Sequence, residues 1–428
     1  MTVPEKTQVG IIGAGPAGLM LAHLLHLYGI ESVILEAKSE EYVLGRVRAG
    51  VLDNDVADLF IATGVGERMQ KSGLTQTRME FRFNGQSRVM NWSELAGGRR
   101  NVVYGQQEVV KDLIAKRREL GGHLYFDTPV VGVSNLTQGK PRITYEYQGQ
   151  TRELECELVA GCDGYHGVAR QSIPKTAITE YERRYPFAWM GILAAVPPSR
   201  EWLISASHDR GFALHSMRSR QVTRLYIQIP PEDTEADWPD ERIWDELDIR
   251  LALDGWTLNR GPVFQKGKVD LRSFVCEPMQ YGSLFLAGDS AHVVPPTGGR
   301  GMNQAISDVA VLADAMNAYF NGSNRTLLDR YSAKCLRRVW RAQYFTNRMT
   351  GMLQRRDFTD TYTRRLQIAE LDLVTSDPKA AAELAQHYTG EPLESDFLPN
   401  DRKSLVTRSR PEPDRAQGNS AATRGGNG

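Results

Sequence analysis

The chain has 428 residues, of which 41% are hydrophobic and 24% are charged. This content is enough to bury at least one large core, so we expect an ordinary globular protein with two or three domains. Lysine plus arginine (52) equals aspartate plus glutamate (52), so the formal net charge is zero and no global field would recruit nucleic acid or an anionic membrane.

The cysteines and the N-terminus limit the class of protein further. Cys156, Cys162, Cys276 and Cys335 show no paired metal-ligand spacing, and a chain of this length needs no disulfide staples, so we expect reduced thiols and no metal site. The start "MTVPEKTQ" is polar and has no apolar signal region, and nowhere do about eighteen apolar residues run together. A cytoplasmic protein is the default prediction.

The first elements of the chain predict a βαβ unit. "TQVGIIGAG" is a short apolar strand that ends in glycines, "PAGLMLAHLLHLYG" has helical spacing, and "SVILE" is a second strand. The glycines match the dinucleotide fingerprint, in which Gly13 permits the tight turn, Gly15 lets backbone approach a pyrophosphate and Gly18 permits close helix packing. Glu36, at the end of the second strand, would accept hydrogen bonds from ribose hydroxyls.

Two later apolar runs end in aspartate and glycine, namely "ELVAGCDG" at 157–164 and "SLFLAGD" at 283–289. We predict that both are inner strands whose carboxyl ends face the same ligand as the first strand. Asp289 is suited to a ribitol hydroxyl. The stiff turn "PPTGGRGMN" then opens a helix near Gly301, and a second helix N-terminus at this edge fits the pyrimidine end of a flavin, which favours FAD.

The remaining segments differ from this pattern. Residues 180–275 contain alternating stretches such as "RLYIQIP", which predict a mostly antiparallel sheet, and residues 301–319 and 327–353 have helical apolar spacing. We therefore predict an α/β protein with a mixed parallel sheet, an antiparallel substrate sheet and a helical C-terminal region. The predicted parts are an FAD-binding domain (1–179), a substrate-binding domain (180–275), the rest of the FAD site with a helical interface region (276–398), and a disordered tail (399–428).

Three of these motifs resemble those of a known family. "GAGPAG", "GCDGYHGVARQ" and "FLAGDSAHVVPPTGGRGMN" look like the FAD-contacting motifs of class A flavoprotein aromatic hydroxylases. "YVLGRVRAGVL", "VVYGQQEV", "RGFALHSMRS" and "LRSFVCEPMQYG" resemble the 4-hydroxybenzoate 3-monooxygenase branch, and the similarity runs from about Thr7 to about Pro392. The resemblance implies an FAD enzyme, commonly a homodimer, that takes electrons from NADPH or NADH and hydroxylates a benzoate ring with O₂ through a flavin C4a-hydroperoxide.

The resemblance also implies cofactor positions. FAD would contact Gly13, Gly15, Gly18, Glu36, Arg46, Arg48, Gln106, Asp163 and Asp289, with the flavin ring near Pro296, Thr297, Gly298, Met302 and Asn303. The nicotinamide nucleotide, which binds transiently in the family, is implied at His166 and Arg272. Lys38 and Tyr42 lie in the segment that tunes NADPH against NADH, where Glu40 would oppose a 2′-phosphate, so NADH use is a hypothesis.

The substrate positions follow from the same resemblance. Those implied to bind substrate are Ser216, Arg218, Tyr226, Ser205, Trp189, Val51 and Thr297, and those implied at the reacting centre are Arg224, Tyr388, Pro296 and Asn303. Arg218 would supply the donor fork that fits a carboxylate. On spacing alone, Ser216 and Arg218 fit an exposed polar edge equally well, and Arg46 and Arg48 fit a solvated surface pair better.

The sequence departs from the family at two positions of its proton relay. Ser205 stands where the family has the tyrosine that deprotonates the para hydroxyl, and Gln76 replaces the distal histidine, whereas Tyr388 is retained. A serine is too short for this role, and glutamine cannot relay a proton. Because an amino group donates electron density without deprotonation, we predict an amino- or amino-hydroxybenzoate such as 3-amino-4-hydroxybenzoate, with 4-hydroxybenzoate converted to protocatechuate as the alternative.

Two other classes of protein stay open. An NAD-dependent dehydrogenase would use "GAGPAG" alone, and it leaves Asp163, Asp289 and "PPTGGRG" without a role. A non-catalytic flavoprotein ligand sensor would explain the lost relay, but it has no need for the retained Arg218 and Tyr226. Flavin absorbance and substrate-stimulated NAD(P)H oxidation would distinguish these classes.

Overall fold

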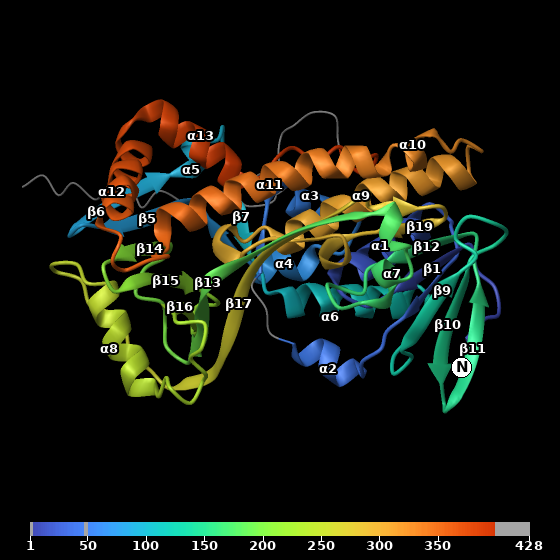
Figure 1. The fold of residues 1–428 in the computed structure, drawn as a ribbon, viewed down its shortest axis with the longest axis horizontal. Coiled ribbons are helices and arrows are strands. Elements are labelled where there is room, and N and C mark those ends of the chain that lie inside the picture. The colour runs from blue at the N-terminus through green and yellow to red at the C-terminus, as the bar shows by residue number, and fades with distance from the viewer. Residues whose placement is uncertain (1–2, 47–49, 399–428) are drawn as a thin grey trace, which may run out of the picture.

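The computed structural model describes residues 3–46 and 50–398, and its largest layers are two sheets joined by long strands (Figure 1). The first sheet has six strands in the order β18-β19-β12-β1-β2-β8. They are β1 (Val9–Ile12), β2 (Ser32–Leu35), β8 (His123–Tyr125), β12 (Leu158–Gly161), β18 (Gln280–Tyr281) and β19 (Leu284–Leu286). All neighbours pair in parallel except β18 and β19. Every residue of β1, β2, β12 and β19 is buried, as expected for a parallel sheet covered on both faces.

The three strands predicted to face one ligand lie side by side in this sheet. Because β1, β12 and β19 are parallel neighbours, their carboxyl ends lie at the same edge. The helix α1 (Pro16–Leu27) packs against both α6 (Gln106–Glu119) and α9 (Gly301–Phe320). The prediction of a helix over 301–319 is therefore confirmed. The second predicted helix, over 327–353, is divided in the structure, because α10 (Thr326–Asp329) ends before α11 (Tyr331–Leu353) begins.

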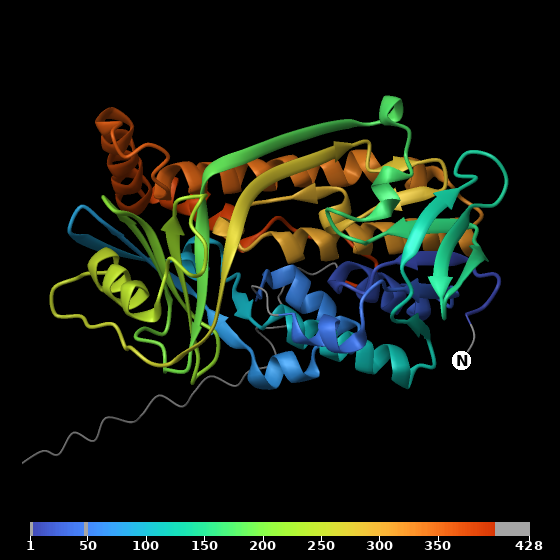
Figure 2. The same ribbon diagram turned by 60° about the horizontal axis from the view of Figure 1, so that its bottom comes forward.

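The second sheet has eight strands in the order β20-β17-β13-β16-β15-β14-β5-β6, and all neighbours are antiparallel except β14 and β5. Its members are β5 (Arg78–Phe83), β6 (Gln86–Asn91), β13 (Thr179–Ala194), β14 (Leu203–His208), β15 (Gly211–Met217), β16 (Thr223–Ile229), β17 (Val263–Glu277) and β20 (His292–Val293). Residues 78–91, which lie outside the predicted substrate segment, thus join its sheet. The long β13 and β17 run from this sheet towards the parallel one (Figures 1 and 2).

Helices cover both faces of the antiparallel sheet. One face packs against α8 (Asp240–Arg250) through a core that includes Ile204, Ala213 and Ile227. The other face packs against the C-terminal helices α11, α12 (Thr361–Ser376) and α13 (Pro378–Thr389). In Figure 1, α12 and α13 lie at the upper left, and α11 runs from there across the top of the molecule. Trp189 and Leu214 belong to this second core. The strand period of two therefore decides which side chains face the C-terminal helices.

Smaller elements complete the described part of the chain. The two three-stranded sheets consist of β9 (Val130–Ser134), β10 (Arg142–Tyr147) and β11 (Gln150–Glu155), and of β3 (Val51–Leu52), β4 (Leu74–Gln76) and β7 (Asn101–Val103). The short helices are α2 (Glu40–Gly45), α3 (Asn54–Ala62), α4 (Glu67–Ser72), α5 (Trp92–Leu95) and α7 (Val168–Gln171). Cys156, Cys162, Cys276 and Cys335 are free and buried. No helix within residues 3–46 and 50–398 is both long and apolar enough to cross a membrane.

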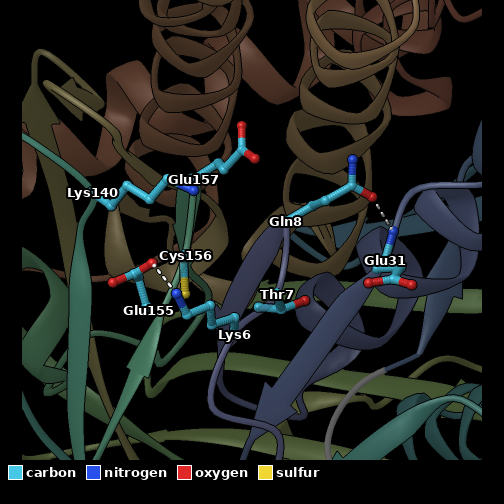
Figure 3. Close-up of a pocket in the computed structure, with 8 residues that line it drawn as sticks. All are labelled: Lys6, Thr7, Gln8, Glu31, Lys140, Glu155, Cys156 and Glu157. Atoms are coloured by element: carbon cyan, nitrogen blue, oxygen red, sulfur yellow. Dashed lines mark hydrogen bonds and ion pairs between the residues drawn. The ribbon is translucent and has the colours of Figure 1, made fainter.

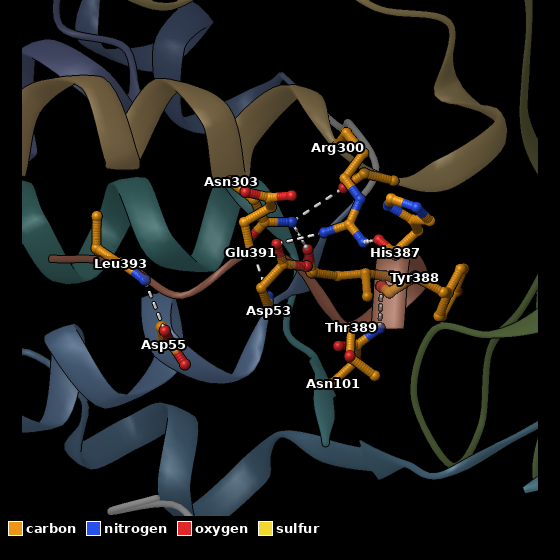
Figure 4. Close-up of polar contacts among 12 residues, drawn as sticks. Asp53, Asp55, Asn101, Arg300, Asn303, His387, Tyr388, Thr389, Glu391 and Leu393 are labelled. Atoms are coloured by element: carbon orange, nitrogen blue, oxygen red, sulfur yellow. Dashed lines mark hydrogen bonds and ion pairs between the residues drawn. The ribbon is translucent and has the colours of Figure 1, made fainter. Parts of the chain in front are cut away.

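A buried polar cluster connects three segments that are far apart in the sequence (Figure 4). Arg300, just before α9, is 2% exposed and donates hydrogen bonds to the carboxylate of Asp53 and to the carbonyl oxygen of His387. Burial raises the pKa of Asp53 above its ordinary value, and the attraction of Arg300 opposes that shift. Gly390 packs directly on this pair, since a Cβ there would overlap the Asp53 carboxylate. The cluster fixes the end of α13 against the start of α9.

Replacement of Arg300 tests how much this cluster contributes to the stability of the fold. In Arg300→Met the Asp53 carboxyl must stay buried without its partner or take up a proton, so we expect the free energy of unfolding to fall by about 3 kcal/mol or more. Urea unfolding at neutral pH measures this change. The control is Arg260→Met, because Arg260 pairs with Asp245 and Asp248 at the surface and should contribute less than about 1 kcal/mol. Equal losses in the two variants would contradict the assignment.

Candidate active site

The glycine turn after β1 lies at the carboxyl edge of the parallel sheet. Gly13 has a φ of 101°, and a Cβ there would lie 2.6 Å from the carbonyl oxygen of Cys162. A Cβ at Gly18 would overlap the carbonyl oxygen of Gly13, whereas nothing lies within 4 Å of a Cβ at Gly15. The turn is therefore tightly packed at its two outer glycines and open at the middle one. The open position is the N-cap of α1, where backbone amides and the helix dipole favour a pyrophosphate.

Glu36 follows β2 beside this turn, with its carboxylate already fixed in place. Its two oxygens accept hydrogen bonds from the backbone amides of Ala14 (2.7 Å) and Lys38 (2.8 Å). A carboxylate has about four lone-pair positions, so acceptor capacity is left for ribose hydroxyls. The position therefore suits the role that the fingerprint predicts.

Two further carboxylates follow the adjacent strands. Oδ2 of Asp163 accepts a hydrogen bond from the backbone amide of Ala169 (2.9 Å), and its buried Oδ1 has no partner among the described residues. Burial raises the pKa of Asp163. Asp289 lies half-buried in the 3-10 helix η2 (Gly288–Ser290) after β19. An orphaned acceptor and an open glycine turn at one sheet edge fit a polar ligand such as FAD, because both leave groups that need a partner from outside the chain.

The η2 turn is supported by a buried pair that the sequence reasoning missed. The Asp308 carboxylate accepts a hydrogen bond from the backbone amide of Gly288 (3.0 Å) and lies 2.6 Å from Nε2 of His292. Burial lowers the pKa of His292, but the Asp308 charge raises it above its ordinary value overall. Gly288 itself has a φ of 64°. This pair holds the turn that presents Asp289.

The predicted flavin-ring segment forms a compact turn before α9. Residues Pro296–Gly298 form the 3-10 helix η3, and Oγ1 of Thr297 lies 2.9 Å from Oγ1 of Thr350 in α11. A Cβ at Gly298 would lie 2.6 Å from the ring of Phe345, so only glycine fits there without a shift of that ring. Met302 is half-buried in the first turn of α9. The turn is thus held from behind by α11.

Asn303 connects this turn to β3. Its side-chain amide donates to the carbonyl oxygens of Val51 (2.8 Å) and Gly299 (3.0 Å), and its Oδ1 accepts from the backbone amide of Asp53 (2.9 Å). The side-chain amide of this predicted reacting-centre residue is therefore used within the chain. Its contribution at this position is to hold β3 beside the turn.

The other predicted cofactor residues of the described chain differ in exposure, with Gln106 half-buried and Arg46 exposed. Gln106 begins α6 directly after Gly105, and Arg46 follows α2 as an exposed residue. Arg48 lies outside the described residues. Lys38 and Tyr42 form a pair in which the ammonium lies 5.8 Å from the ring centroid. Glu40 beside them is paired with Arg118 at 2.5 Å, which reduces the negative charge that the NADH hypothesis relies on.

The predicted nicotinamide residues meet at one aromatic ring. The ring of Tyr165 lies edge-to-face with that of His166 at a centroid distance of 4.8 Å. The guanidinium of Arg272 lies 4.3 Å from the Tyr165 ring centroid. His166 is exposed. The structure thus brings these two residues, which are far apart in the sequence, to one ring, whereas Lys38 and Tyr42 pair with each other.

Four of the predicted substrate residues, on β13, β14, β15 and β16, share one face of the antiparallel sheet, namely Trp189, Ser205, Ser216 and Tyr226. Ser216 pairs with Arg224 across β15 and β16, and Leu214 pairs with both Tyr226 and Ser205. Because side chains alternate along a strand, these residues face the same side as Trp189, towards the C-terminal helices. The Trp189 ring lies 5.0 Å from the Tyr226 ring, and its Nε1 donates to Oε1 of Gln354 (3.1 Å).

Two half-buried arginines lie at the end of this face. Burial, together with the charge of Arg224, lowers the pKa of Arg218 to about 10. Arg218 donates a hydrogen bond to the side-chain oxygen of Gln107, which is neutral. Nη1 of Arg224 is buried and has no partner among the described residues, and its guanidinium lies 5.6 Å from the Tyr226 ring. Within the described chain no carboxylate pairs with either guanidinium, so the site has positive charge available for an anion.

The relay positions lie in a closed polar region. Tyr388 is 5% exposed and stacks on Trp92 at a centroid distance of 3.7 Å, and burial raises the pKa of its phenol well above the ordinary value. Gln76 pairs with Asn101 across β4 and β7, and Asn101 donates to the carbonyl oxygen of Tyr388 (3.4 Å). The amide oxygens of both are buried without a partner among the described residues. Ser205, 2% exposed, has no hydrogen bond to Tyr388 in this part of the chain.

A polar pocket of about 180 Å³ lies elsewhere in the same half of the molecule (Figure 3). It is lined by Lys6, Thr7, Gln8, Glu31, Lys140, Glu155, Cys156 and Glu157. Gln8, Glu31 and Glu157 directly precede β1, β2 and β12, so the pocket lies at the amino edge of the parallel sheet. It is therefore on the opposite edge from the fingerprint, Asp163 and Asp289.

Comparisons with known proteins agree with this geometry. Residues 6–346 match the family described as FAD binding domain. The chain is 42% identical over 390 residues to p-hydroxybenzoate hydroxylase of Acinetobacter baylyi, covering 91% of this chain and 96% of that protein. It is 25% identical over 348 residues to a 3-(3-hydroxy-phenyl)propionate/3-hydroxycinnamic acid hydroxylase of Mycolicibacterium gilvum, covering 78% of this chain but only 58% of that longer protein.

Solved structures show the same fold. The p-nitrophenol 4-monooxygenase of Pseudomonas putida aligns with a TM-score of 0.77 at 20% identity, over 91% of this chain and 100% of that one. An anhydrotetracycline hydroxylase of Streptomyces rimosus aligns with a TM-score of 0.71 at 20% identity, over 90% of this chain and 76% of that one. The chain therefore belongs to the FAD-binding-domain family and is a flavin-dependent aromatic hydroxylase.

Proposed function

We propose that this hydroxylase acts on a benzoate-type ring and uses NADPH or NADH and O₂ as co-substrates. The observation that carries the proposal is the half-buried pair Arg218 and Arg224, which has no carboxylate partner among the described residues. Burying uncompensated positive charge costs free energy, and an aromatic carboxylate would supply both the missing anion and an apolar ring for the same face. FAD, bound at the carboxyl edge of the parallel sheet, supplies the oxidative chemistry.

The substrate residues have distinct proposed roles. The Arg218 fork binds the carboxylate, assisted by the hydroxyls of Ser216 and Tyr226, while Arg224 places a second charge beside the ring. The apolar walls are Trp189, Val51 and Thr297. Pro296 and the backbone before Asn303 would hold the flavin ring. A substrate clamped at its carboxylate presents one ring edge to the flavin in a fixed orientation.

We further propose that the ring carries an amino group. The buried amide of Gln76 cannot transfer a proton, and Ser205 has no contact with Tyr388 that would relay one. A ring amine donates electron density in its neutral form, so it needs neither group. The 42% identical relative is named p-hydroxybenzoate hydroxylase, which favours the alternative substrate, 4-hydroxybenzoate, and the two proposals are separated by experiment.

A substrate panel decides between these rings. We expect 3-amino-4-hydroxybenzoate and 4-aminobenzoate to stimulate NAD(P)H oxidation and to yield hydroxylated product with a kcat/KM about tenfold above that of 4-hydroxybenzoate, since a relay of this kind contributes about tenfold or more. Product is quantified against NAD(P)H consumed, because uncoupled oxidation would imitate turnover. Fast, coupled formation of protocatechuate from 4-hydroxybenzoate, with aminated benzoates only bound, would contradict the amine and support the alternative.

Restoring the two relay side chains provides a second test. In Ser205→Tyr combined with Gln76→His, we expect hydroxylation of 4-hydroxybenzoate to rise by about tenfold and to become dependent on pH near the ordinary histidine pKa of about 6.5. Stopped-flow measurement of product formation between pH 6 and pH 9 follows the change. The control is Ser205→Phe with Gln76→His, which adds ring volume without a hydroxyl. An equal rise in both double variants would assign the effect to packing.

We also propose a homodimer formed through α12. Tyr362 (74% exposed), Leu366 (53%) and Leu373 (53%) form an apolar stripe along this helix. Arg365 lies in its first half and Asp372 in its second, so antiparallel pairing with the same helix of a second copy would bring opposite charges together. The stripe has helical spacing, which suits packing against another helix.

The oligomeric state tests this surface. We expect the wild type to sediment at twice the mass of the chain and Leu366→Glu to sediment as a monomer at low micromolar concentration, because a charge would then be buried in the contact. The matched control is Leu327→Glu, since Leu327 is exposed (46%) on another helix. A monomeric wild type, or a dimer that Leu366→Glu leaves intact, would exclude this interface.

A further inference from the structure

The carboxylate-binding arginine is held in place by the first turn of α6. Arg218 donates through Nη2 to Oε1 of Gln107, and the guanidinium lies against the backbone of Gly105, where a Cβ would overlap it. Gly105 is the N-cap of α6, and Gln106 between the two is a predicted FAD contact. The same helical turn thus carries the predicted FAD contact and, at the next residue, the partner of the substrate arginine.

The acid on the same turn is occupied by other cations. Glu108 lies 2.5 Å from Nη2 of Arg68 and 3.0 Å from the ammonium of Lys111. These contacts lower the pKa of Glu108, although its partial burial acts in the opposite direction. Since the charge of Glu108 is directed to Arg68 and Lys111, the direct partner of Arg218 on α6 is the neutral amide of Gln107.

We propose that Gln107 is a positioning residue that orients the Arg218 fork while leaving its charge free for the substrate carboxylate. This inference rests on the proposed function, in which Arg218 binds a benzoate. A guanidinium has five N–H donors, so one hydrogen bond to an amide oxygen fixes its orientation and leaves the other donors available. An amide does not neutralise the fork. A carboxylate in its place would bind the guanidinium in bidentate fashion and compete with the substrate.

The test of this inference therefore changes the charge of residue 107. Glutamate has nearly the same shape as glutamine, so Gln107→Glu alters the charge with little change in volume. We expect the Kd for 4-hydroxybenzoate or 3-amino-4-hydroxybenzoate to rise at least about tenfold, as for loss of a charge-assisted contact. The Kd for the corresponding benzamide should change less than about threefold, because a neutral amide does not compete for the same charge. Binding is measured on the FAD-loaded enzyme from the perturbation of flavin absorbance.

The matched control is Gln150→Glu. Gln150 accepts a hydrogen bond from Arg152 (3.1 Å) on the exposed β11, so it repeats the same substitution beside an arginine outside the site. This variant should bind both ligands as the wild type does. Steady-state kinetics provide a second readout, since Gln107→Glu should raise KM for the acid more than it changes kcat.

Four outcomes distinguish a failure of this inference from a failure of the proposed function. If the wild type binds the acids and Gln107→Glu binds them within about twofold of it, the positioning role is wrong and the proposed function stands. If Gln107→Glu weakens acid and amide equally, the effect is structural, and the inference is again wrong. If Gln107→Glu does not retain FAD, Gln107→Leu decides, with weakened acid binding and unchanged amide binding expected. A wild type that binds no benzoate overturns the proposed function itself.

Discussion

Two half-buried guanidinium groups without a carboxylate partner in the described chain are the constraint on which the substrate site depends. Arg224 lies on the face of the antiparallel sheet that packs against the C-terminal helices. Arg218, just after β15, lies against the first turn of α6, where burial lowers its pKa. Such charge is expensive to bury, and it persists only where a ligand of opposite charge, or a group that the fold holds in place, offsets it. The neutral Gln107 orients one of the two groups without offsetting its charge. The sheet therefore keeps an unbalanced charge beside an aromatic wall, which is the combination that an aromatic acid balances.

Strand pairing and a buried ion pair fix the two sheets relative to each other. The long strands β13 and β17 pair with each other and run between the sheets, and β17 also pairs with β20, which follows the η2 turn. The Arg300 cluster then fixes the end of α13 to the start of α9 (Figure 4). Tyr388 follows directly after the carbonyl that Arg300 binds. The residues that would face the flavin and those that would face the ring are thus held by the same buried ion pair.

Short sequence motifs were sufficient to predict the site residues whose position depends on the local backbone. The fingerprint glycines, Glu36, Asp163 and Asp289 all follow strand ends, and strand ends are visible as apolar runs followed by glycine or aspartate. The contacts of Arg300 with Asp53 and of Arg218 with Gln107 join residues 247 and 111 positions apart, and nothing in either segment indicates the partner. The same is true of β5 and β6, which complete a sheet that begins almost a hundred residues later. Such pairings depend on tertiary packing.

The proposal of a ring amine rests on the region around Tyr388. A proton path needs groups that both donate and accept, arranged in sequence to solvent. Here the phenol stacks on Trp92, its pKa is raised by burial, and the neighbouring Gln76 and Asn101 are amides whose oxygens are buried without partners in the described chain. Amide oxygens accept hydrogen bonds but hold no proton at neutral pH, so water beside them could be bound but not acidified. These surroundings would not help a phenol ring to lose its proton. A ring amine is reactive in its neutral form, so it would not need to lose one.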